Sequence, residues 1–156
     1  MEPITCQDVA NFFLLHASQD EEAELVTNLK LQKLVYYAQG FHLAACHLPL
    51  FDEKIVAWRH GPVVQELYNT GKKYGSSPIP VLFDAEDSMK KFTKTQKELL
   101  SDIYQVYGQY TAWRLRDMTH EEMPWVEADS RRKADETVEI TVDVLRKFFQ
   151  TRLIHD

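Results

Sequence analysis

His42 and Cys46 stand four residues apart, a spacing that places two side chains on the same face of a helix. Imidazole and thiolate groups are common zinc ligands, so this pair could form part of a metal site. A complete site needs a third and a fourth ligand, and the sequence dictates neither. His42 also falls among apolar residues, which favours a hydrogen-bonded histidine in the core. We therefore predict neither a metal nor another cofactor.

Two further histidines could support acid–base chemistry. His120 is followed directly by Glu121 and Glu122, and His60 precedes Glu66 by six residues. An imidazole close to a carboxylate can act as a general acid or base, so a hydrolase is one hypothesis. The chain lacks an HExxH motif, a GxSxG motif and a phosphate-binding loop. The alternative is that both histidines form hydrogen bonds at helix starts, and we predict no enzyme and no catalytic residue.

Basic and aromatic side chains gather in two short segments. The first contains Lys72 and Lys73 before a tyrosine, and the second contains Arg114 and Arg116 after Trp113. Together they could form a basic, aromatic surface for nucleic acid, which gives a regulator as another hypothesis. The whole chain has 24 acidic and 18 basic residues and a net charge of −6. This balance disfavours a protein that neutralises phosphates, and solvated helix faces explain such charges equally well.

The elements that position these residues are organised around residues 28–47. One side of this predicted helix is apolar at Leu31, Leu34, Val35, Ala38, Phe41, His42 and Ala45, and the opposite side at Leu29, Tyr36 and Leu43. A helix that is apolar on two sides either crosses the middle of a domain or shows one face to a partner. We expect a central buried helix, with the Tyr36 face as a possible contact for a partner or for a second copy in a homodimer.

The remaining pattern indicates a mainly α-helical fold with a minor short β element, in one domain over residues 1–156. A helix begins after Thr5, and an acidic linker follows at 19–24. The segments 55–58 and 137–140 are expected to form paired strands. Proline is common at the first position of a helix, so a helix is expected to begin at Pro62 and to continue past Tyr68. Further helices are expected after Thr93 or Thr95, after Thr111, over 124–128 and after Thr141; 81–83 is ambiguous, and 84–91 is either a helical turn or a loop.

Cysteine usage and the lengths of the apolar runs indicate the cellular compartment of the protein. Cys6 and Cys46 lie far apart and belong to no CxxC motif, which is typical of reduced cysteines in an intracellular protein. The first residues lack the basic start of a signal peptide, and no apolar run reaches the roughly 18–20 residues that span a bilayer. We expect a cytoplasmic protein without a membrane anchor.

Four motifs occur in an order that is more specific than any one of them. LKLQKLVYYAQGFHLA is followed by PLFDEKIVAWRHGPVVQELY, then KKYG, then YGQYTAWRLRDMTHEEMPW. This series resembles the Panacea domain family, which includes SocA-like antitoxins and phage-associated GepA-like proteins. The resemblance covers most of the chain, from about Val9 to Trp125. It implies a compact helical domain that restrains a cognate protein toxin by direct binding, in some members as an adaptor that delivers the toxin to a ClpXP-type protease.

The resemblance also directs attention to particular residues. The family motif matches at Trp58, Arg59, His60, Gly61, Pro62, Tyr68, Thr119, His120, Pro124 and Trp125. Gly61 and Pro62 are interpreted as turn residues. Aromatic and arginine side chains often anchor protein interfaces. We therefore expect partner contacts among Tyr36, Trp58, Arg59, His60, Tyr68, Trp113, Arg114, His120 and Trp125.

Overall fold

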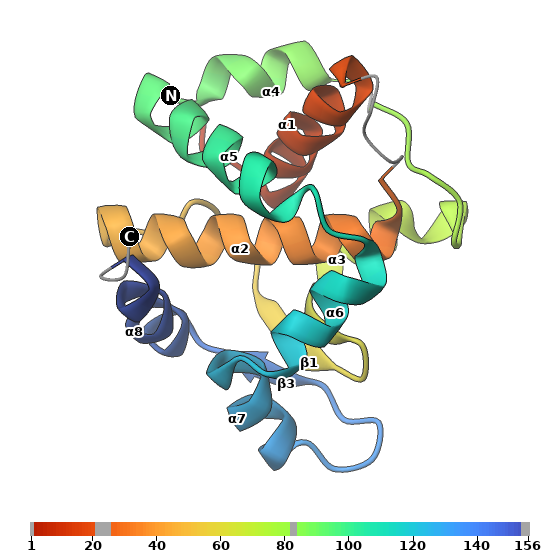
Figure 1. Ribbon diagram of the computed structural model, residues 1–156, viewed down its shortest axis with the longest axis vertical. Coiled ribbons are helices and arrows are strands. Elements are labelled where there is room, and N and C mark those ends of the chain that lie inside the picture. Colours follow the sequence, from red (N-terminus) through yellow and green to blue (C-terminus); the bar gives the residue numbers. More distant parts are fainter. Residues whose placement is uncertain (1, 21–25, 82–83, 154–156) are drawn as a thin grey trace.

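One long helix, α2 (Asn28–Cys46), crosses the middle of the molecule, with other helices above and below it (Figure 1). The structure is a computed structural model that describes residues 2–20, 26–81 and 84–153. Most residues of α2 are buried, as the two apolar rows predicted, although Ala45 near its C-terminal end is exposed. Thr27 begins the helix, because its hydroxyl accepts a hydrogen bond from the Lys30 backbone N–H. His47 ends it in the left-handed conformation, with a φ of 62°.

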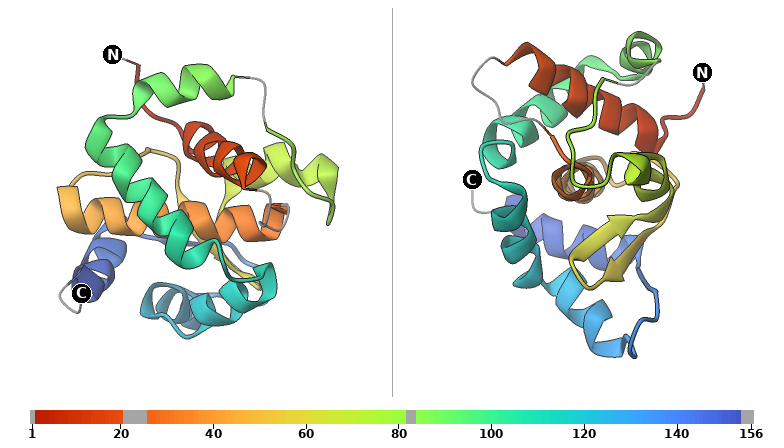
Figure 2. Two further views of the ribbon diagram at one scale, coloured as in Figure 1. Left: turned by 45° about the horizontal axis from the view of Figure 1, so that its top comes forward. Right: turned by 90° about the vertical axis from the view of Figure 1, so that its right-hand side faces the viewer.

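The other elements form two groups around α2, and the view along its axis shows them surrounding it (Figure 2, right). One group contains α1 (Cys6–Gln19), α4 (Ala85–Lys91) and α5 (Lys94–Tyr107). The other contains a small sheet and α6 (Ala112–His120), α7 (Met123–Arg131) and α8 (Val142–Leu153). The short helix α3 (Gln65–Gly71) and the 3-10 turn η1 (Lys72–Tyr74) follow the sheet's second strand. The fold is mainly α with a minor β element.

The sheet has three antiparallel strands in the order β2-β1-β3. β1 (Ile55–Trp58) lies in the centre, and β3 (Val138–Ile140) pairs with it as predicted. The prediction that a helix begins at Pro62 is wrong, because residues 61–64 form β2 and α3 begins only at Gln65. Gly61, with a φ of 112°, permits the tight reversal from β1. Pro62 fits β2 because β2 is an edge strand, where a missing backbone N–H need not break the sheet.

Most other helix boundaries follow their capping residues. The hydroxyls of Thr5, Thr93, Thr111 and Thr141 each accept a backbone hydrogen bond from the first turn that follows. Residues 85–91 form a helix, and α7 extends to Arg131, beyond the end at 128 that the sequence predicted. The acidic linker at 19–24 and the ambiguous segment at 81–83 lie largely outside the described residues.

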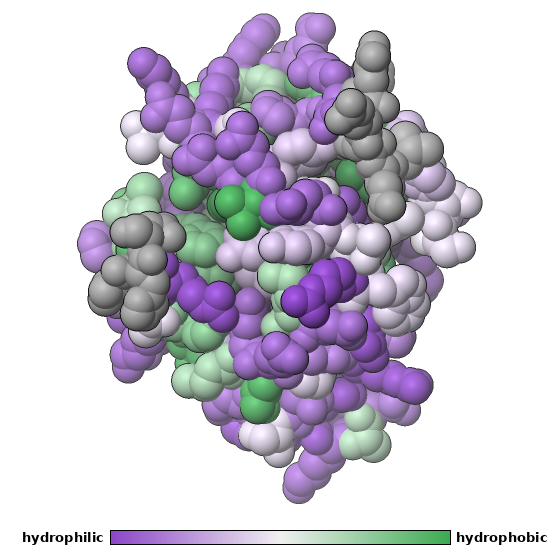
Figure 3. All heavy atoms as spheres, viewed as in Figure 1, coloured by the Kyte–Doolittle hydropathy of each residue, from purple (hydrophilic) through white to green (hydrophobic). Residues whose placement is uncertain are grey.

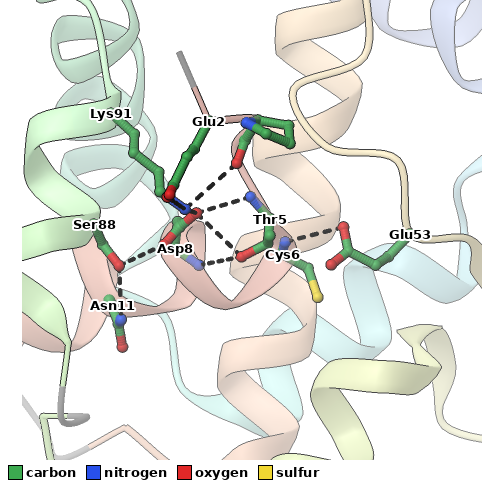
Figure 4. A network of polar contacts seen from close by, with 9 residues as sticks. Glu2, Thr5, Cys6, Asp8, Asn11, Glu53, Ser88 and Lys91 are labelled. Carbon is green, nitrogen blue, oxygen red and sulfur yellow. Dashed lines mark hydrogen bonds and ion pairs between the residues drawn. The ribbon is translucent and has the colours of Figure 1, made fainter.

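A buried polar network joins α1 to α4 (Figure 4). The Asp8 carboxylate accepts hydrogen bonds from the Thr5 backbone N–H at 2.9 Å, the Ser88 hydroxyl at 2.6 Å and the Lys91 ammonium at 2.9 Å. Ser88 also accepts a hydrogen bond from Asn11 at 2.9 Å. Burial alone would raise the pKa of Asp8, but these donors outweigh it and hold the pKa below its ordinary value.

The surface seen in Figure 3 is mostly hydrophilic, with apolar atoms showing in the area between α5 and α8. None of the helices in the described ranges is long and apolar enough to cross a membrane. The described surface also exposes single large apolar side chains, of which Leu48 and Trp113 are the most exposed, at 66% and 60%.

Candidate functional site

A cavity of about 710 Å³ lies beside the N-terminal end of α2. Its walls come from α2, the turn between β1 and β2, the segment from α3 to Ser76, and the start of α6, elements that surround the end of α2 in Figure 2 (right). Its volume falls within the usual range for small-molecule sites. The lining residues are Thr27, Asn28, Leu29, Gln32, Lys33, Trp58, Arg59, His60, Val63, Tyr68, Lys72, Gly75, Ser76, Thr111, Ala112 and Trp113.

The cavity combines basic and aromatic side chains. Arg59 and Lys72 are exposed, Lys33 is buried, and the rings of Trp58 and Tyr68 meet edge to face with their centroids 5.0 Å apart. Among the residues that the structure describes, no aspartate or glutamate lines the cavity. The lining is therefore locally positive, although acidic residues predominate in the chain as a whole.

Lys33 is the unusual residue of this site, since its side chain has no accessible surface. Its ammonium donates a hydrogen bond to the Pro62 carbonyl at 3.1 Å. No ion pair to Lys33 occurs among the described residues. Burial, together with the smaller effect of the nearby Arg116 charge, lowers the pKa of Lys33 to about 7.

Gly61 allows the β1–β2 turn to approach Lys33 closely. A Cβ atom on Gly61 would lie 2.9 Å from the Thr119 hydroxyl and 3.2 Å from the Lys33 ammonium. A side chain at this position would force both groups to move. The positive φ of Gly61 and this lack of space together explain why glycine suits the position.

A chain of contacts fixes the turn against α6. Arg116 Nε donates a hydrogen bond to His60 Nδ1 at 3.2 Å, and its guanidinium lies 5.4 Å from the Trp113 ring centroid. Trp113 also meets His60 edge to face, with the centroids 6.1 Å apart. Burial, followed by the charges of Arg116, Arg59 and Lys33, holds the pKa of His60 below its ordinary value. His60 is therefore mainly neutral near pH 7.

The second candidate histidine, His120, is held by a different set of contacts. His120, at the end of α6, stacks on Trp125 with the centroids 4.1 Å apart. Trp125 Nε1 donates to the Trp58 carbonyl at 2.8 Å, and Trp58 Nε1 donates to the Thr137 hydroxyl at 3.1 Å. These contacts connect α6 and α7 with the sheet. The prediction that both histidines lie at helix starts is wrong, because His60 lies in a turn and His120 is the last residue of α6.

The acid–base pair required by the hydrolase hypothesis is not formed in the described part of the chain. His60 accepts a hydrogen bond from Arg116, and within the described ranges neither histidine has a hydrogen bond to a carboxylate. The Glu122 carboxylate instead accepts hydrogen bonds from the hydroxyls of Tyr36 and Tyr37, at 3.0 and 2.9 Å. His120 Nε2 is buried without a hydrogen-bond partner in this part of the structure.

His42 and Cys46, the two candidate metal ligands, lie in different surroundings. His42 Nδ1 donates to the Leu48 carbonyl at 2.7 Å, and its Nε2 accepts from the Gln96 amide at 3.3 Å, as expected of a hydrogen-bonded core histidine. Cys46 is exposed. The described residues contain no cluster of three or more side chains that could hold a metal ion.

The predicted contact residues divide into three groups. Trp58, Arg59, His60, Tyr68 and Trp113 line the cavity. Arg114 is exposed on α6, while His120 and Trp125 pack beside the sheet. Tyr36 has no accessible surface and packs on Phe149 of α8 with the centroids 5.5 Å apart. The chain itself thus covers Tyr36, whereas Leu29 on the same face of α2 is half-buried and lines the cavity.

Lys33 was not among the residues singled out from the sequence. A signal was present, because Lys33 stands between Leu29 and Tyr36 on the second apolar row of a helix predicted to be buried. A lysine at such a position is either paired or functional.

These features define the class of protein: a small, mainly helical protein with a cavity lined by basic and aromatic side chains and no histidine–carboxylate pair among its described residues. More specifically, the chain belongs to the family described as antitoxin SocA-like, Panacea domain, whose model matches residues 31–126. The matched region contains the cavity residues from Gln32 to Trp113. No match was found among curated proteins or among solved structures.

Proposed function

We propose that this protein is an antitoxin that neutralises a cognate protein toxin by direct binding. Membership of the SocA-like family is the observation that carries the proposal. The proposed contact surface is the rim of the cavity, formed by the turn residues Arg59 and His60 and by Trp113 and Arg116 of α6. Trp113 supports this choice, because it is 60% exposed and is held in place by His60 and Arg116. Tryptophan and arginine are the residue types that most often dominate binding energy.

The first experiment expresses the product of an adjacent gene with and without this protein. Growth arrest by the neighbour alone, relieved on co-expression, together with a complex that survives purification, is the expected result. A neighbour that neither arrests growth nor binds would contradict the proposal.

The contact surface is tested with Trp113→Ala. We expect the dissociation constant of the complex to rise at least tenfold, since loss of an interface tryptophan commonly costs about 2 kcal/mol. Leu48→Ala is the matched control, because Leu48 is equally exposed but lies beyond the C-terminal end of α2. Equal effects of the two substitutions would exclude the rim as the contact surface.

Delivery of the toxin to a ClpXP-type protease is a further part of the proposal, which the family resemblance suggests. Masking and delivery predict different fates for the toxin. Purified protease should degrade the toxin faster when this protein is added if delivery operates, and at an unchanged or slower rate if the protein only masks the toxin. The toxin half-life in this reaction therefore separates the two mechanisms.

A further inference from the structure

The cavity beside the N-terminal end of α2 has properties that binding of a large protein surface does not require. It is a concave space of about 710 Å³, large enough for a compact organic molecule. A flat rim with an exposed tryptophan would suffice for a protein contact. A concave site of this size therefore indicates a small-molecule ligand in addition to a protein partner.

The charge of the lining indicates an anion. Arg59 and Lys72 line the cavity and are exposed, and Lys33 lies in its wall without an ion-pair partner among the described residues. A buried charge is costly unless another charge compensates it. Lys33 is covered from solvent and its pKa is lowered to about 7, so an anion bound in the cavity would favour the charged form of its ammonium.

The two amide side chains of the wall, Asn28 and Gln32, are already engaged in hydrogen bonds. The Gln32 side chain donates to Asn28 at 3.0 Å and accepts from the Val64 backbone N–H at 2.9 Å. The Asn28 amide donates to the Tyr68 carbonyl at 3.3 Å. These amides hold α2 against the sheet and α3, so recognition of a ligand falls to the cationic groups and to the aromatic rings.

The aromatic part of the lining indicates what the anion carries. Trp58, Tyr68 and Trp113 all reach the cavity, and Trp113 retains much exposed ring surface. Planar bases stack on such rings with about 1–3 kcal/mol per base, and lysine and arginine bind phosphate groups. We propose that this cavity binds a free mononucleotide, with its phosphate near Arg59, Lys72 and Lys33 and its base against the tryptophan rings. The site shares Arg59 and Trp113 with the proposed toxin contact, but nucleotide binding is measured without a toxin and so is tested independently of the proposed function.

The test is a calorimetric titration of the intact protein with AMP, GMP, CMP and UMP, beside inorganic phosphate and adenosine. At least one mononucleotide should bind with a dissociation constant below about 1 mM, and at least tenfold more tightly than either inorganic phosphate or adenosine. The indole N–H signals of Trp58 and Trp113 should shift in NMR spectra of the same titration. Failure of all four mononucleotides to bind would overturn the proposal.

Variants place the ligand in the cavity. Lys33→Met should weaken binding at least fivefold, and so should Arg59→Ala, which lies in an exposed turn and does not threaten the fold. Lys30→Met is the matched control, because Lys30 is also buried on α2 but bonds to the Gly108 carbonyl and does not line the cavity. Unchanged binding in both Lys33→Met and Arg59→Ala would exclude this site.

A final titration tests whether the bound phosphate belongs to a free nucleotide or to a nucleic-acid strand. A single-stranded tetranucleotide without a terminal phosphate presents the same base and phosphodiester chemistry as part of a strand. Weaker binding of the tetranucleotide than of the best mononucleotide supports a free nucleotide as the ligand. Tighter binding of the tetranucleotide would overturn the proposal and identify the cavity as part of a nucleic-acid surface.

Discussion

The carboxylate of Glu122 lies almost completely inside the protein, under the hydroxyls of Tyr36 and Tyr37. Burial raises the pKa of Glu122 to about 7, although the two hydroxyls and the more distant Arg152 act in the opposite direction. Asp8, which is also buried, has a lowered pKa because more donors reach it. The number and charge of the hydrogen-bond donors thus decide which protonation state each buried carboxyl group favours.

Substitution of Glu122 should change how stability depends on pH. The folded protein holds the Glu122 proton more tightly than the unfolded chain, so this stabilisation is complete below pH 4.5 and is lost as the pH rises through about 7. Glu122→Gln should remove this dependence, which amounts to about 3 kcal/mol at most. The measurement is the free energy of unfolding in urea from pH 4 to 8, taken as the difference between variant and wild type.

Asp8→Asn provides the control. Its carboxyl group has a lowered pKa, so the stability that it contributes is present above its ordinary pKa and is lost as the pH falls below that value. The difference between this variant and the wild type should be constant from pH 5 to 8. A constant difference for Glu122→Gln over the same range would show that Glu122 is ionised throughout.

At the scale of elements, the capping residues and the apolar spacing predict the helices well. The threonine caps, the central place of α2 and the extended conformation of β1 and β3 follow from local signals. β2 is the exception, because Gly61 and Pro62 are found both at helix starts and in tight turns. The choice between them depends on a partner strand and on the hydrogen bond from the Val64 backbone N–H to Gln32 of α2, which local sequence cannot reveal.

The packing of α8 on α2 depends on the absence of a side chain at Gly40. A Cβ atom there would lie 2.1 Å from the Phe149 ring, which also meets Phe41 with the centroids 4.8 Å apart. Gly40→Ala should therefore destabilise the protein by about 1–3 kcal/mol, although alanine favours helices. Thermal or urea unfolding measures this change.

A second substitution identifies the cause of that loss. Phe149→Leu removes the ring that the new methyl group would meet, so Gly40→Ala should cost less in the Phe149→Leu background. A double-mutant cycle gives the coupling energy between the two positions. Additive effects would show that the Gly40 contact with Phe149 does not limit the packing of α8.

At the scale of the whole molecule, net charge and local charge differ. The chain carries a net charge of −6, whereas the described lining of the cavity is basic. Trp58, Arg59, His60 and Tyr68 match the family motif, and Trp113 belongs to a basic and aromatic segment of the sequence. Neither signal could show that these residues surround a cavity or that Lys33 lies in its wall. Both properties arise where α2, the β1–β2 turn and α6 meet, and these segments are far apart in the sequence.

The net charge predicts how an antitoxin of this kind would associate with a basic toxin. Long-range attraction accelerates encounter, and salt screens it. Raising the salt concentration from about 0.05 to 0.5 M should lower the association rate constant roughly tenfold, with a smaller change in the dissociation rate constant. Stopped-flow measurements on the purified pair give both values, and an association rate constant that is independent of salt would exclude steering by net charge.

The burial of α2 also has a kinetic consequence. This helix is covered on one side by α1 and α5 and on another by α8, which follows α2 only after the sheet, α6 and α7. Contacts between segments so distant in sequence close large loops, and folding that depends on them is slow. Until α8 docks, Gly40 and the rings of Tyr36 and Phe41 lack their contact with Phe149, so an incomplete chain offers a molecular chaperone a definite apolar surface to bind.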